Sequence, residues 1–280
     1  MTTLISAQAM AELDRDDVLV VDCRFDLADA SRGAREYAMA HVPGAVYADL
    51  NRDLCDLARQ GLGRHPLPEP EQFSRTLARW GWTPLSRVVA YDDAGGALAA
   101  ARLWWLLRLA GAIDVAVLDG GFKAWRESGA KVSDAEPPQR EQTHVTVNFD
   151  PSEIVYTEEL QRNRAEILLL DARAAPRFRG EMETIDSVAG HIPGARNRPF
   201  GDNLRADGRF KSPDELRAEF TAILAGTKPE NVVHSCGSGV TACHNLLAME
   251  HAGLHGSRIY APSWSGWISE ATRAVAVGEA

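Results

Sequence analysis

The sequence has few cysteines, no long apolar run and no concentration of basic residues. Four cysteines in 280 residues are too few for a disulfide-stabilised scaffold, so we expect reduced thiols. No stretch reaches the roughly 18 apolar residues of a membrane span, and the first residues lack the basic and apolar segments of a secretory signal. A net charge of −9 without a Lys/Arg cluster argues against nucleic acid. We therefore expect a cytoplasmic protein that binds neither membrane nor nucleic acid.

Four segments of the first half recur in the second half, in the same order. The pairs are Val20–Arg24 with Leu169–Arg173, His41–Ala45 with His191–Ala195, Arg87–Tyr91 with Asn231–Ser235, and Gly121–Trp125 with Ser263–Trp267. Their offsets of 149, 150, 144 and 142 residues are nearly constant, which chance similarity does not produce. The chain is therefore interpreted as a duplication, with domains at residues 1–130 and 153–280 and a linker at residues 131–152.

Each half alternates short apolar runs with amphipathic stretches, a pattern typical of α/β domains. We predict strands at residues 18–22, 88–91, 115–119, 167–171, 232–235 and 259–261, and helices at residues 70–80, 98–110, 213–224 and 240–252. Strands this apolar are typical of parallel sheets that helices cover on both faces. The predicted fold is thus two tandem α/β domains, each a parallel sheet flanked by helices. In such sheets ligands bind beyond the carboxyl ends of the strands.

The segment Cys236-Gly-Ser-Gly-Val-Thr241 follows such a strand directly and leads into a predicted helix. Its glycines allow the backbone to curl so that successive N–H groups point at one anion. We expect Cys236 to be held as a thiolate, and an anionic sulfur to be bound by the backbone of Gly237, Gly239, Val240 and Thr241. The ordinary alternative is a buried, inert cysteine. A catalytic role requires that solvent reaches the sulfur.

The first half offers an internal comparison, because Asp92 aligns with Cys236. The nucleophile is thus present in only one copy, and we expect the first domain to be catalytically silent. A metal site is not expected, since His234, Cys236, Cys243 and His244 lack the usual ligand spacing. A cysteine phosphatase is excluded because Ala242 stands where an arginine would clamp phosphate.

The loop Cys236–Ala242, the paired His-x-Pro-Gly-Ala segments and the Asp-x-Arg strand ends resemble the tandem-domain rhodanese superfamily. The similarity is strongest to enzymes of the 3-mercaptopyruvate sulfurtransferase type, because Gly237 and Ser238 stand where thiosulfate enzymes usually carry charged residues. The resemblance implies a sulfurtransferase with a persulfide on Cys236 and no cofactor. Its implied partners are a small anionic sulfur donor and a thiol, cyanide or thioredoxin-like acceptor. The alternatives are a thiosulfate sulfurtransferase and a persulfide carrier or scaffold without turnover.

The resemblance also implies roles for three side chains outside the backbone of the loop. Ser238 would polarise or protonate during the first step, or else only shape the loop. His41 would transfer a proton, or else be a turn histidine that holds backbone groups. Arg177 would bind the donor carboxylate with a bidentate guanidinium pair.

The second arginine that the family commonly carries in this segment is missing from the chain. The segment reads Glu181-Met-Glu-Thr-Ile-Asp186, which is shorter and acidic. Arg179 and Arg196 are the candidates to replace it. Whether a second cation reaches the donor decides how well an anionic donor would bind.

Overall fold

The computed structural model describes residues 3–14, 18–137 and 140–279. The chain forms two compact units. The first contains residues 1–56, 67–150 and 206–210, and the second contains residues 57–66, 151–205 and 211–280. Residues 57–66 lie in the first half of the sequence but belong to the second unit, and residues 206–210 lie in the second half but belong to the first unit.

The first unit is built on a five-stranded parallel sheet in the order β1-β5-β4-β2-β3. Its strands are β1 (Leu4–Ile5), β2 (Val18–Asp22), β3 (Val46–Tyr47), β4 (Arg87–Tyr91) and β5 (Val115–Leu118). Its helices are α1 (Ala7–Ala11), α2 (Arg32–Met39), α3 (Leu50–Asp53), α4 (Pro70–Arg79), α5 (Ala100–Leu109) and α6 (Gly121–Glu127).

The second unit repeats this arrangement with a five-stranded parallel sheet in the order β6-β10-β9-β7-β8. Its strands are β6 (Ile154–Val155), β7 (Leu168–Asp171), β8 (Arg196–Asn197), β9 (Val232–Ser235) and β10 (Arg258–Tyr260). Its helices are α7 (Thr157–Arg162), α8 (Ala175–Phe178), α9 (Pro213–Leu224), α10 (Ala242–His251) and α11 (Ser263–Trp267), with 3₁₀ turns η1 (Pro151–Glu153), η2 (Phe200–Asn203) and η3 (Pro229–Asn231). Because the two strand orders are equivalent, the predicted duplication and the predicted fold class are confirmed.

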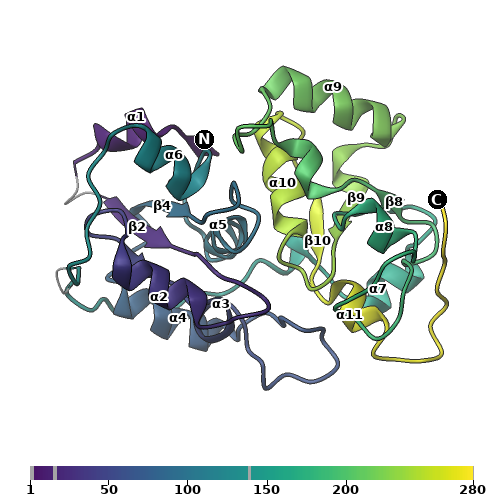
Figure 1. The fold of residues 1–280 in the computed structure, drawn as a ribbon. Coiled ribbons are helices and arrows are strands. Elements are labelled where there is room, and N and C mark those ends of the chain that lie inside the picture. Colours follow the sequence, from purple (N-terminus) through teal and green to yellow (C-terminus); the bar gives the residue numbers. More distant parts are fainter. Residues whose placement is uncertain (1–2, 15–17, 138–139, 280) are drawn as a thin grey trace. The chain divides into compact units, whose positions relative to one another are not determined.

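The central strands are buried because helices cover both faces of each sheet (Figure 1). All residues of β2 and β9 are buried, as their apolar composition predicts. The helices α5 and α10 begin two residues later than expected, since the preceding loops take up those residues. The two-residue strands β1, β3, β6 and β8 were not predicted, because so short a segment shows no periodicity.

A buried aspartate–arginine pair closes the carboxyl end of one strand in each sheet. Arg24 binds Asp22 through Nε and Nη2, at 3.0 and 2.6 Å from Oδ2, and Arg173 binds Asp171 in the same way. Each arginine also donates to a backbone oxygen, that of Ala40 or of Gly190. The presence of the same contacts in both units supports a role of these pairs in the fold.

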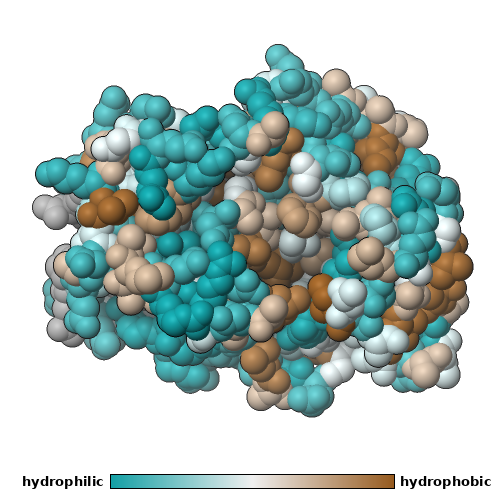
Figure 2. Space-filling model, in the orientation of Figure 1, coloured by the Kyte–Doolittle hydropathy of each residue, from teal (hydrophilic) through white to brown (hydrophobic). Residues whose placement is uncertain are grey.

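No helix in residues 3–14, 18–137 and 140–279 has the length and apolarity needed to cross a lipid bilayer. The face drawn in Figure 2 is mostly hydrophilic, with hydrophobic residues in separate patches. Large apolar side chains that are exposed include Met39, Leu85 and Met182. Scattered exposure of this kind is normal for folded proteins.

Candidate functional site

The cysteine loop begins where β9 ends. Ser235, the last residue of β9, pairs with Asp171 of β7, so Cys236 lies at the carboxyl end of the sheet, as predicted. Gly239 has a φ of +78°, a conformation that favours glycine, and its N–H donates to Cys236 Sγ at 3.1 Å. The loop then enters α10 at Ala242. The backbone thus directs at least one amide at the sulfur.

Cys236 itself is only 2% exposed. The sequence-based hypothesis required a sulfur within reach of solvent, and this exposure leaves little of the residue open. The neighbouring Ser238 and Val240 are each 7% exposed. The reactivity of the sulfur therefore stays a prediction, and chemical labelling of Cys236 tests it directly.

The segment before and within α11 holds the cysteine loop in place. Cys236 N–H donates to Ser263 Oγ at 3.1 Å, and Trp264 N–H donates back to the Cys236 carbonyl at 2.9 Å. Ser265 N–H donates to the Gly237 carbonyl at 2.9 Å. Ser263 adopts a φ of +51°, which is unusual for a residue other than glycine. Ser263 is next to Cys236 through this hydrogen bond, and backbone strain of this kind is common at functional sites.

In the first unit, the corresponding loop is occupied by its own carboxylate. Asp92 is fully buried, and its two oxygens accept five backbone N–H groups at 2.8–3.2 Å. The donors are Ala94, Gly96, Leu98, Ala99 and Ala100. Burial raises the pKa of the Asp92 carboxyl, and these N–H donors oppose that rise. The loop of the first unit is thus an anion cradle that its own side chain fills.

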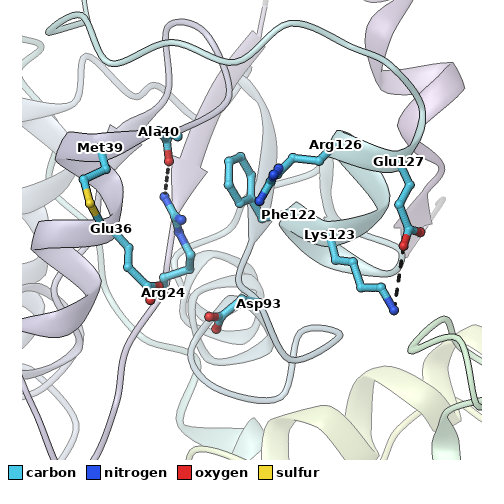
Figure 3. Close-up of a pocket in the computed structure, with 9 residues that line it drawn as sticks. All are labelled: Arg24, Glu36, Met39, Ala40, Asp93, Phe122, Lys123, Arg126 and Glu127. Atoms are coloured by element: carbon cyan, nitrogen blue, oxygen red, sulfur yellow. Dashed lines mark hydrogen bonds and ion pairs between the residues drawn. The ribbon is translucent and has the colours of Figure 1, made fainter.

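A cavity of about 730 Å³ lies near this loop in the first unit (Figure 3). It is lined by Arg24, Glu36, Met39, Ala40, Asp93, Phe122, Lys123, Arg126 and Glu127. Figure 3 shows Arg24 donating to the Ala40 carbonyl at 2.7 Å and Lys123 facing Glu127 at 3.8 Å. The lining contains no cysteine, serine or histidine. The cavity of the first unit therefore has no nucleophilic side chain in its lining, and the candidate nucleophile Cys236 lies in the second unit.

Arg177 lies beside the cysteine loop, where the sequence predicted it. A Cβ built on Gly237 would be 3.7 Å from both Nη1 and Nη2 of Arg177. The guanidinium binds Glu183 through Nε and Nη2, and Nη2 also donates to Asp186 Oδ2 at 2.9 Å. Burial tends to raise the pKa of Glu183, but the N–H groups of Asp186 and Ile185, with Arg177, lower it below its ordinary value.

Neither expected substitute for the missing arginine lies at this loop. Arg179 binds Glu181 at 2.7 Å and approaches Glu279, while Arg196 donates to the Ile223 carbonyl at 2.7 Å. The second cation is instead Arg64, whose Nη2 would be 3.1 Å from a Cβ on Gly237. The expectation for Arg179 and Arg196 was wrong because a segment distant in sequence brings the second cation to the loop.

His65 is a further residue that the sequence analysis missed. Its Nδ1 lies 2.8 Å from Ser238 Oγ, and both side chains are buried. A signal for this segment was available, because Gly63-Arg64-His65 aligns with Gly208-Arg209-Phe210 at an offset of 145 residues. This fifth match keeps the order of the others, and the histidine is present in only one copy. That difference parallels the difference between Cys236 and Asp92.

His41 lies in the first unit and has a position equivalent to that of His191. The His41 ring stacks on Tyr37 and its Nδ1 is 2.7 Å from the Tyr37 carbonyl oxygen. His191 stacks on Phe178 and contacts the Phe178 carbonyl oxygen in the same manner, at 2.8 Å. This equivalence supports a role in the fold, and the catalytic role of His41 stays a prediction.

The other three cysteines are fully buried. Burial, together with Asp22, raises the pKa of the Cys23 thiol, and burial raises that of Cys55 to about 12. Cys243 donates its S–H to the Gly239 carbonyl at 3.3 Å. Cys23 and Cys55 are thus poorly suited to nucleophilic chemistry at neutral pH.

The chain was compared with known families, proteins and structures. A family model described as the rhodanese-like domain matches residues 6–128 and 156–270. A Pseudomonas aeruginosa protein described as a probable 3-mercaptopyruvate sulfurtransferase is 48% identical over 99% of this chain and 98% of its own length. A thiosulfate sulfurtransferase of Cricetulus griseus is 32% identical over 96% of this chain and 92% of its own.

Among solved structures, the chain is similar to the 3-mercaptopyruvate sulfurtransferase from Leishmania major. The TM-score is 0.85 at 33% identity, covering 94% of this chain and 73% of that one. The sequence matches indicate the same family as the structure does, with its two equivalent parallel sheets and its cysteine loop after β9. The chain belongs to the rhodanese family and contains two rhodanese-like domains in tandem.

Proposed function

We propose that the chain is a sulfurtransferase that takes sulfur from 3-mercaptopyruvate, holds it as a persulfide on Cys236 and passes it to a thiol or cyanide. The observation that carries the proposal is the position of Cys236 at the carboxyl end of β9, with the Gly239 N–H on its sulfur and two guanidinium groups over Gly237. A nucleophilic sulfur beside cations and loop amides suits an anionic sulfur donor.

In the first half-reaction the Cys236 thiolate attacks the sulfur of the donor. A sulfur–sulfur bond forms, the donor's carbon–sulfur bond breaks, and its electron pair stays on carbon as the enolate of pyruvate. The outer sulfur of the persulfide then carries the anionic character that the backbone of Gly237, Gly239, Val240 and Thr241 would bind. The donor carboxylate would approach Nη1 of Arg177, since Nε and Nη2 of this guanidinium bind Glu183 and Asp186.

The enolate needs a proton to leave as pyruvate, and we infer that Ser238 and His65 supply it. Ser238 Oγ lies 2.8 Å from His65 Nδ1, so the histidine can return a proton to the hydroxyl after the hydroxyl has given one up. We therefore assign Ser238 as the proton donor and His65 as the residue that orients and reprotonates it.

In the second half-reaction an acceptor thiolate or cyanide attacks the outer sulfur. The sulfur–sulfur bond breaks, and its electron pair returns to Cys236 as the thiolate. The acceptor leaves as a persulfide or as thiocyanate, and no redox cofactor is consumed. A thioredoxin-like protein is one acceptor of this class, and a cytoplasmic location is our prediction from the sequence.

We further propose that the first domain takes no part in sulfur chemistry, since the carboxylate of Asp92 fills the cradle that Cys236 heads in the second domain. The predicted boundaries, residues 1–130 and 153–280 with a linker at 131–152, belong to this proposal.

Purified protein tests the proposed function with two donors. With 3-mercaptopyruvate and cyanide we expect continuous release of pyruvate, and trapping without acceptor should add about 32 daltons to the peptide that contains Cys236. Cys236→Ser should lose both signals, while the control Cys55→Ala should keep them. Sulfite release from thiosulfate, without pyruvate release from 3-mercaptopyruvate, would replace this proposal by the thiosulfate alternative. A mass gain without turnover would indicate a persulfide carrier.

A further inference from the structure

The segment that carries Arg64 packs closely against the start of α11. Arg64 N–H donates to Ser265 Oγ at 2.9 Å. Gly63 has a φ of +93°, and a Cβ there would lie 2.5 Å from the Pro262 carbonyl oxygen. Only glycine allows this close approach. The position of the Arg64 backbone is therefore fixed relative to the loop that Ser263, Trp264 and Ser265 hold.

One carboxylate holds Arg64 and Arg177 side by side. Asp186 Oδ1 accepts from Arg64 Nη1 at 2.5 Å, and Asp186 Oδ2 accepts from Arg177 Nη2 at 2.9 Å. The Asp186 side chain is only 3% exposed, so this bridge is shielded from water. Two guanidinium groups repel each other, and a shared buried carboxylate offsets that repulsion.

The Arg64 side chain keeps one hydrogen-bonding edge unused. Other arginines of the chain use the edge formed by Nε and Nη2 to bind a carboxylate in a fork. Arg24, Arg173, Arg177 and Arg179 do so. In the part of the chain that the structure describes, Arg64 bonds its carboxylate through Nη1, and its Nε is buried without a partner. A buried N–H of this kind costs about 1–3 kcal/mol and calls for an explanation.

The unused edge is next to the nucleophile loop. Nη2 of Arg64 would be 3.1 Å from a Cβ on Gly237, which directly follows Cys236. The Arg64 side chain is 25% exposed and that of Arg177 is 18% exposed. Both cations therefore have surface that a small anion can contact.

We propose that Arg64 is a specificity-determining residue that binds the donor's carboxylate together with Arg177, and that Asp186 positions both guanidinium groups. The inference rests on the proposed function and adds to it the residue that selects donors with a carboxylate close to the sulfur. The side chain comes from residues 57–66, far in sequence from Arg177.

Steady-state kinetics of Arg64→Gln, Arg177→Gln and the control Arg179→Gln test this assignment. We expect both site variants to raise KM for 3-mercaptopyruvate by about tenfold or more with a smaller change in kcat, because a ground-state contact is lost. Arg179→Gln should leave KM unchanged, since that guanidinium binds Glu181 on the surface. A KM for Arg64→Gln within about threefold of the wild type would overturn the inference.

A second measurement separates charge recognition from a local disturbance of His65. Cys236 is alkylated with iodoacetate, which carries a carboxylate, and with neutral iodoacetamide, and the ratio of the two rates is taken from peptide masses. Arg64→Gln should lower this ratio by about threefold or more, whereas a structural disturbance slows both reagents alike. A smaller change in the ratio would also overturn the inference.

Failure of the proposed function gives a different result. If the wild type releases no pyruvate but its alkylation ratio depends on Arg64, Arg64 recognises a carboxylate without the proposed reaction, and the claim about the donor falls. If the wild type neither turns over nor reacts with the reagents, the proposed function fails and the inference fails with it.

Discussion

Replacing Asp92 by asparagine keeps the shape of the side chain and removes its charge. In the native protein, Oδ1 accepts from Ala94 and Gly96 at 2.9 and 2.8 Å, and Oδ2 accepts three further N–H groups at 3.0–3.2 Å. An asparagine has one oxygen, so its NH₂ group must face at least two backbone donors. Three of the five donors, Gly96, Ala99 and Ala100, are buried, and those of Ala94 and Leu98 are partly buried.

The expected cost follows from these contacts. A hydrogen bond to a charged acceptor contributes about 1.5–3 kcal/mol, so losing two costs roughly 3–6 kcal/mol. Burying a neutral amide in place of a carboxylate offsets part of this loss. We therefore expect Asp92→Asn to destabilise the first unit by about 3 kcal/mol, a large share of the 5–15 kcal/mol of a typical domain.

Hydrogen exchange measured by mass spectrometry resolves the two units separately. Peptides from β4 and α5 should exchange faster in Asp92→Asn, while peptides from β9 and α10 serve as the reference within the same molecule. Asp93→Asn is the matched control, since Asp93 contacts Arg32 at only 3.4 Å with 29% of its side chain exposed. If Asp92→Asn destabilises by less than about 1 kcal/mol, the five amides do not depend on the charge and the cradle argument is wrong.

Burial lowers the pKa of His234 to about 3, below the ordinary value of 6.5, so the unfolded state binds the proton first as pH falls. The free energy of unfolding is therefore highest above pH 6.5 and falls progressively down to about pH 3, by about 1 kcal/mol between pH 7 and 5.5. Urea unfolding at several pH values should show a shallower pH dependence for His234→Asn than for the wild type. Equal pH dependence in the two proteins would contradict this assignment. Gly63→Ala would place a Cβ 2.5 Å from the Pro262 carbonyl oxygen and displace Arg64 and His65. We expect pyruvate release to fall about tenfold or more. Gly61→Ala shares the backbone strain, with a φ of +76°, but its Cβ would meet nothing within 4 Å, so it should retain most of the activity. Equal activities in the two variants would show that the segment need not pack against α11.

The sequence by itself determined the duplication, the difference between Cys236 and Asp92, and the approximate positions of the six longer strands and of helices α4, α5, α9 and α10. These features are local, because hydrophobic periodicity reports which residues face a core and a strand followed by glycines reports a loop into a helix. The helix α9 was predicted with its observed bounds, Pro213–Leu224, since a serine N-cap and a proline mark its start. For the acidic segment Glu181–Asp186, the sequence indicated only that the second arginine of the family is missing, and not that a carboxylate there binds two arginines.

Only the tertiary structure decided what surrounds the cysteine loop. His65 lies 173 residues from Ser238 in sequence, and no periodicity predicts their contact. Residues 57–66 join the second unit because Gly63 and Gly266 permit close backbone approach at the start of α11. The same packing brings Arg64 to Asp186, so that the acidic run becomes the bridge between two cations. Such contacts depend on which distant surfaces fit together, and that information is spread over the whole fold.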